Sequence, residues 1–127
     1  MDALSVLLQN VHLFETKYYR LNGAGNWSYS MSRKDTILFY LVMSGGFCID
    51  VGNGLREARA GDMIMIPNAH KHVSYALSHH GDVAEPLDEL LTNCQDRTLE
   101  IDGNGDPNSS LILIECKYDK EMISPLL

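Results

Sequence analysis

The stretch that decides the fold runs from Gly61 to Val73 and reads GDMIMIPNAHKHV. Gly61 has access to backbone conformations that other residues avoid, so the Gly-Asp pair indicates a turn. The four apolar residues that follow, 63–66, predict a short, well-buried strand. Pro67 ends this strand because it fixes φ and has no N–H to donate. A returning strand is predicted from about His72 to Tyr75, and the His72 side chain is expected to point inward.

Short segments with strand patterns, separated by turn residues, lie on both sides of this stretch. The sequence predicts strands at 13–20, 27–32, 37–43, 47–51, 55–59, 63–66, 72–75 and 111–118, with 47–51 the partner of 37–43. Turns are expected at 21–26, 44–46, 52–54 and 103–108, and short helices at 2–9 and 86–91. This organisation favours a mostly β fold, an antiparallel double-sheet jelly roll with two added helices.

Size and composition indicate a single domain without a membrane span. The chain has 127 residues and a mass of 14.2 kDa, which allows one hydrophobic core. No apolar run approaches the ~20 residues needed to cross a bilayer, and the first residues lack a basic, cleavable leader. The three cysteines, Cys48, Cys94 and Cys116, are widely spaced, which is typical of reduced thiols. A cytoplasmic location is therefore expected.

The charge distribution argues against direct binding of nucleic acid. The net charge is -7 and the isoelectric point is about 5.0. A domain that grips phosphate backbones usually carries a basic stripe, and the local basic cluster Arg33-Lys34 is too small for that role. The chain by itself is expected not to bind DNA.

The pattern in the opening stretch resembles the second motif of the cupin family, Gly-x5-Pro-x-Gly-x2-His. Gly61, Pro67 and His72 match it, and Ala69 stands where the family has its second glycine. The wider order of features resembles the N-terminal cupin domain of AraC-type transcriptional regulators over essentially the whole chain. These features are the helix at 2–8, Gly25-x-Trp27, the segment 39–45, the helix at 86–91 and the turn at 103–105. A last strand that ends at 118–119 and the closing segment 125–127 complete the series.

The resemblance implies a cupin-type double-stranded β-helix that forms one domain over residues 1–127. It also implies a C-terminal helix-turn-helix domain downstream of this chain, through which alone the protein would contact DNA. The apolar residues at 121–127 agree with an end that is cut inside a longer polypeptide or docked on a partner. The function implied is that of a non-catalytic domain that senses a small-molecule effector in the barrel, mediates dimerisation, or does both.

A symmetric homodimer is expected on two grounds. Regulators with paired helix-turn-helix units commonly read repeated half-sites, so a two-fold assembly of the sensor domain is useful. The chain also carries two sets of apolar residues that the barrel need not cover: the face of the helix at 86–91, and Met122, Ile123, Leu126 and Leu127 at the end. A linker or DNA-binding domain would cover the second set in a longer protein, so we expect Leu87, Leu90 and Leu91 to form the dimer surface.

The alternation of side chains along each strand predicts which residues face the barrel interior. Positions equivalent to metal ligands face inward in cupins, and the two-residue period extends that face along the strands. The candidate ligand-binding residues are Tyr29, Met31, Tyr40, Val42, His72 and Ser74. A filled core without a pocket is the alternative, because small barrels are often filled.

Metal-dependent catalysis is the second functional alternative. Enzymatic cupins carry two histidines and a glutamate in their first motif, and those positions fall near Met31, Arg33 and Leu38 here. None of the three is a usual metal ligand, and His72 is the one remaining candidate, so neither metal nor other cofactor is expected. A stand-alone cupin enzyme, such as a metal-dependent isomerase or oxygenase, remains as the alternative reading.

Overall fold

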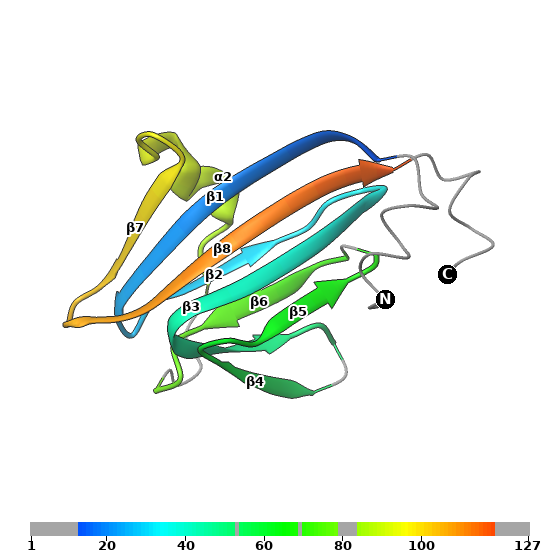
Figure 1. Cartoon of the computed structure of the whole chain (residues 1–127). Helices are drawn as coiled ribbons and strands as arrows, with labels where there is room; N and C mark the ends of the chain where they lie inside the picture. Colours follow the sequence, from blue (N-terminus) through cyan, green and yellow to red (C-terminus); the bar gives the residue numbers. More distant parts are fainter. Residues whose placement is uncertain (1–12, 53, 69, 79–83, 119–127) are drawn as a thin grey trace.

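Eight strands and one short helical segment make up the part of the chain that the structure describes. The computed structural model describes residues 13–52, 54–68, 70–78 and 84–118, so the predicted helix at 2–9 lies outside the described residues. The strands are β1 (Leu13–Gly25), β2 (Ser28–Met31), β3 (Thr36–Asp50), β4 (Leu55–Arg59), β5 (Met63–Ile66), β6 (His72–Tyr75), β7 (Thr98–Gly103) and β8 (Pro107–Tyr118). Helix α2 (Leu87–Leu90) and the 3-10 turn η1 (Leu91–Asn93) lie between β6 and β7. The predicted mostly β, barrel-like class is confirmed (Figure 1).

Strand β3 belongs to both sheets of the barrel. Its first part, 36–45, pairs with β5 and β8, and its last part, 46–50, pairs with β4 and β6. One sheet therefore has the order β5-β3-β8-β1-β7, and the other has the order β4-β3-β6-β2. The prediction that 44–46 is a turn between two paired strands is wrong. The chain bends there and continues into the other sheet.

Two glycines explain where β3 bends. Gly45 has φ of +66°, and a Cβ at this position would overlap the carbonyl oxygen of Asn108. A Cβ on Gly46 would lie 2.6 Å from the carbonyl oxygen of Ala58. Both neighbours are backbone atoms of paired strands and cannot move aside easily, so the crossing of the two sheets requires glycine here.

Strands β1 and β7 depart from the prediction. Strand β1 runs through the predicted turn at 21–26 as far as Gly25, and β7 was not predicted. The two strands pair in parallel from Arg20↔Thr98 to Gly25↔Gly103, so the sheets are not wholly antiparallel. The predicted hairpin at 52–54 is confirmed by the pairing of Asp50 with Leu55 at the end of β3 and the start of β4.

The prediction that 63–66 is a well-buried strand holds for one face only. Ile66 is buried and Ile64 is half-buried, whereas Met63 and Met65 are 45% and 41% exposed. Strand β5 pairs with β3 and lies at the edge of its sheet, so its outer face is open to solvent. The apolar run therefore indicates an edge strand rather than a strand covered on both faces.

Helix α2 and the turn after it pack their leucines against the core of the barrel. Leu87 is fully buried, and Leu90 and Leu91 pack against the main core. The domain itself thus buries Leu87 and half-buries Leu90 and Leu91, which leaves a smaller apolar face for the predicted dimer surface. Dimerisation remains a prediction.

Within the described residues, no helix is long and apolar enough to cross a membrane.

Replacing Gly45 tests whether the bend in β3 requires glycine. We expect Gly45→Ala to lower the free energy of unfolding by more than the ~1–2 kcal/mol of left-handed backbone strain, because the methyl group also meets Asn108. Gly61→Ala is the control, since Gly61 has φ of +94° but no atom within 4 Å of its Cβ position. Urea unfolding of both variants measures the difference, and equal losses would contradict the steric explanation.

Candidate functional site

The six predicted interior residues come together from three strands. In the ladder between β2 and β6, Tyr29 lies opposite Ser74 and Met31 lies opposite His72. Tyr40 reaches the same residues from β3 in the facing sheet. All six side chains are buried, the most exposed being Met31 at 5%; the set is Tyr29, Met31, Tyr40, Val42, His72 and Ser74. The structure thus places them in one interior cluster, while their role in binding a ligand remains a prediction.

A chain of hydrogen bonds joins the polar members of this cluster. The Tyr29 and Tyr40 hydroxyl oxygens are 2.6 Å apart, and the Tyr40 hydroxyl lies 2.9 Å from His72 Nε2. His72 Nδ1 lies 3.3 Å from the carbonyl oxygen of His70. A carbonyl only accepts, so Nδ1 carries the proton and Nε2 accepts from Tyr40. Each group therefore donates a hydrogen bond to the next: Tyr29 to Tyr40, Tyr40 to His72, and His72 to the His70 carbonyl.

Burial keeps this chain uncharged. It raises the pKa of Tyr29 and of Tyr40 and lowers the pKa of His72 from its ordinary value of 6.5. The nearby hydroxyl of Ser74 acts in the opposite direction and lowers the pKa of both phenols, although burial outweighs it. It nevertheless makes no hydrogen bond of ordinary geometry to the described residues. A neutral His72 is the form that accepts the proton of Tyr40.

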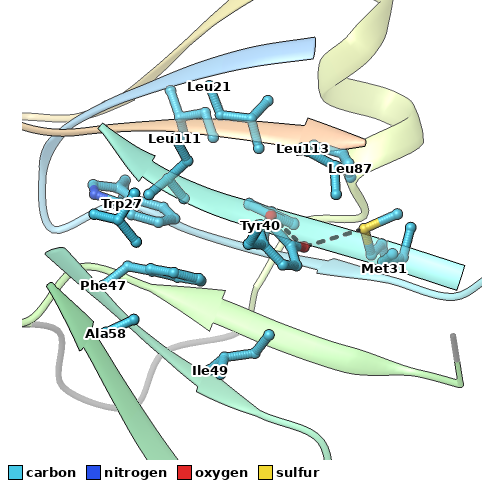
Figure 2. Close-up of a cluster of buried hydrophobic side chains, with 14 of the residues drawn as sticks. Leu21, Trp27, Met31, Tyr40, Phe47, Ile49, Ala58, Leu87, Leu111 and Leu113 are labelled. Carbon is cyan, nitrogen blue, oxygen red and sulfur yellow. Dashed lines mark hydrogen bonds between the residues drawn. The ribbon is translucent and has the colours of Figure 1, made fainter. Parts of the chain in front are cut away.

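The interior around these residues is filled rather than hollow. Tyr29, Tyr40 and Ser74 retain no accessible surface, whereas side chains that line a water-sized cavity would retain some. The ring centroids of Tyr40 and Phe47 are 5.3 Å apart, and Trp27 stacks on Phe47 with a centroid distance of 6.5 Å. Figure 2 shows these rings between the leucines of one sheet and Ile49 of the other. Of the two alternatives, the filled core describes this part of the barrel.

An ion pair links the two sheets at one end of the barrel. Arg33, just after β2, places Nε 2.7 Å from Oε1 of Glu115 on β8 and Nη2 2.8 Å from Oδ1 of Asp88. Glu115 is only 7% exposed. Burial alone would lower the pKa of Arg33, but the two carboxylates outweigh it and raise this pKa. A polar recess of about 510 Å³ surrounds the pair.

An apolar recess of about 290 Å³ lies elsewhere, between β4 and β5. The residues that line it are Ile49, Val51, Arg56, Ile64, Met65, Ile66, Pro67, Asn68 and His70. None of the six predicted site residues is among them. The interior residues follow from strand alternation and the inward face of the cupin motif positions. This recess depends instead on how two edge strands diverge, which no local sequence pattern predicts.

Comparison with known proteins gives a family match and a related regulator. A cupin family model matches residues 2–127. The HTH-type transcriptional regulator AlkR of Acinetobacter baylyi is 22% identical over 129 residues, which cover all of this chain and 42% of AlkR. The chain thus spans about two fifths of the length of this curated relative.

Two solved structures are similar at low identity. A cupin protein from Bacteroides fragilis is 18% identical with a TM-score of 0.48, covering 80% of this chain and 64% of that one. The cupin domain of an XRE family transcriptional regulator from Enterobacter cloacae is 8% identical with a TM-score of 0.47. That match covers 86% of this chain and 95% of the other.

The residues at the family's first-motif metal positions do not fit a metal. Met31 offers only a thioether, with its sulfur 3.4 Å from the Tyr40 hydroxyl, and Leu38 offers no ligand atom. Arg33 brings a positive charge that is already paired. The described residues contain no group of three or more His, Cys, Asp or Glu side chains placed to hold a metal ion.

The lowered pKa of His72 predicts a pH dependence of stability. Below pH ~6.5 the unfolded chain binds a proton at His72 that the folded chain excludes, so stability falls as the pH falls. We expect His72→Gln to remove this part of the loss between pH 7 and 5.5, and the exposed control His70→Gln to keep it. Urea midpoints measured at each pH test this. A His72→Gln variant with the wild-type pH slope would contradict it.

The Arg33–Glu115 pair predicts a second stability effect. Arg33→Met leaves Glu115 buried without its partner, which should cost about 2 kcal/mol or more, less than the ~3–5 kcal/mol of a fully buried pair. Adding Glu115→Leu should recover much of this loss. Arg59→Met, which breaks an exposed pair with Glu57, is the control and should cost under about 0.5 kcal/mol. Urea unfolding of these variants tests the comparison, and equal losses for Arg33→Met and Arg59→Met would contradict it.

Proposed function

Because the chain belongs to the cupin family, we propose that it is the regulatory domain of an AraC-type transcriptional regulator in the cytoplasm. In this proposal the domain responds to a small-molecule effector, brings two copies of the regulator together, or does both. The match to AlkR carries the proposal, since a helix-turn-helix regulator is similar to this chain over the chain's whole length and extends well beyond it.

The charge of the chain supports a regulator in which sensing and DNA binding belong to separate domains. With a net charge of -7, this domain is poorly suited to approach DNA, and a separate helix-turn-helix domain would make that contact. An effector would act by binding one arrangement of the domains more tightly than another. Regulation then needs no chemical step in the barrel.

The composition of the barrel interior supports a non-catalytic role over a cupin enzyme. Its one buried histidine, among the described residues, is held between the Tyr40 hydroxyl and the His70 carbonyl. Arg33 stands at a first-motif position and pairs with two carboxylates. These side chains are engaged with each other, which leaves no convergent set of ligand atoms for a metal-dependent reaction.

Metal content and DNA binding together test the proposal. Protein purified without chelators should contain well below one equivalent of transition metal per chain, by elemental analysis. The intact protein should sediment as a dimer and bind DNA with repeated half-sites, whereas the 127-residue chain should not bind DNA. One metal equivalent per chain that is lost in His72→Ala would instead favour the enzyme.

A further inference from the structure

The apolar recess lies in a wedge between two strands of different sheets. Strands β4 and β5 are joined by the turn at 60–62, which is held by a hydrogen bond from the Gly61 amide to the Val42 carbonyl at 2.9 Å. The two strands diverge from this turn (Figure 1), each pairing with a different part of β3. The wedge is therefore an opening between the edges of the sheets.

The walls of this recess are apolar and come from both sheets. Ile64 and Ile66 lie opposite Tyr40 and Leu38, so they face the interior from one sheet. Ile49 faces them from the other sheet and is 1% exposed. A volume of about 290 Å³ holds on the order of ten non-hydrogen atoms, at about 30 Å³ each. This is the size of a small organic molecule.

Arg56 stands at the rim of the recess without a partner in the described structure. It lies directly opposite Ile49 in the β3–β4 ladder, so both residues are on the inner face. Arg56 makes no ion pair or side-chain hydrogen bond with the described residues. On the same strand, Arg59 pairs with Glu57. The recess thus combines an apolar pocket with an uncompensated guanidinium.

We propose that this recess binds a small amphipathic carboxylate, with its apolar body against Ile49, Ile64 and Ile66 and its carboxylate on Arg56. A guanidinium pairs with a carboxylate through two parallel hydrogen bonds, which specifies the head group. The net charge of -7 repels anions at long range, so the local pairing with Arg56 has to outweigh this repulsion. A neutral ligand would not form that ion pair. The inference rests on the proposed sensing function and names the class of effector and its site.

Octanoate is a suitable probe, because its size is about that of the recess. Isothermal titration calorimetry of the 127-residue chain should show saturable octanoate binding, with octan-1-ol weaker and octylammonium weaker still. Arg56→Gln should weaken octanoate binding at least about tenfold, as expected for the loss of a charge-assisted pair. It should leave octan-1-ol binding unchanged. The matched control Arg59→Gln, on the same strand, should change neither.

A second pair of variants tests the apolar wall. Val51 lines the recess and is 36% exposed, so Val51→Asp should fold and weaken octanoate binding. Met63→Asp adds the same charge at a 45% exposed position outside the recess and should have little effect. Far-ultraviolet circular dichroism and the urea midpoint establish that each variant is folded before its affinity is compared.

The outcomes separate the site from the proposed function. No saturable octanoate binding, or equal affinity in wild type and Arg56→Gln, overturns the site. Equal weakening by Arg59→Gln or Met63→Asp also overturns it, because binding would then follow overall charge. Arg56-dependent binding that leaves the DNA affinity of the intact regulator unchanged upholds the site and removes the sensing function. Regulation by another effector in the absence of octanoate binding upholds the function and removes the site.

Discussion

The passage of β3 from one sheet to the other is the constraint on which the rest of the barrel depends. A single strand of 15 residues pairs with β5 and β8 before its bend and with β4 and β6 after it. The two sheets are therefore tied together through one strand, and the close approach of Gly45 to Asn108 on the neighbouring strand β8 requires glycine at the bend. The core rings of Tyr40 and Phe47 lie on either side of this bend, which brings them into contact.

Away from the bend, two polar links between the sheets have different physical characters. The Tyr40–His72 hydrogen bond joins neutral groups in a filled, dry interior, where an unpaired polar atom is costly. The Arg33–Glu115 pair joins charges at a partly solvated end, where breaking one partner costs more than the pair itself contributes. Neither link reaches the wedge between β4 and β5. A ligand in that wedge would leave both links intact.

The sequence predicted local features of this fold well and non-local ones poorly. Strand alternation, with the inward face taken from the cupin resemblance, predicted six residues that are buried in the structure. The spacing from Gly61 to His72 predicted β5 and β6, because that signal is local. The bend at Gly45 and Gly46 was read as a turn, since two glycines carry the same local signal in either case. The contact of Arg33 with Glu115 joins residues 82 positions apart, and the parallel pairing of β1 with β7 is similarly remote. The inward position of Arg56 follows only from its register with Ile49.

The register also connects the apolar recess with the buried polar chain. Ile64 lies opposite Tyr40, and Ile49 lies opposite Ser74, so two walls of the recess are direct ladder neighbours of the hydrogen-bonded cluster. A ligand that displaces Ile64 would act on Tyr40, and so does protonation of His72, which removes the acceptor for the Tyr40 hydroxyl. When two events act on one group, their coupling is reciprocal. An occupant of the recess changes the protonation constant of His72 by some factor. Protonation of His72 must then change the affinity of the recess for that occupant by the same factor. Because the folded chain holds His72 neutral, an occupant that tightens the Tyr40–His72 bond lowers the pKa of His72 further and binds more weakly as the pH falls.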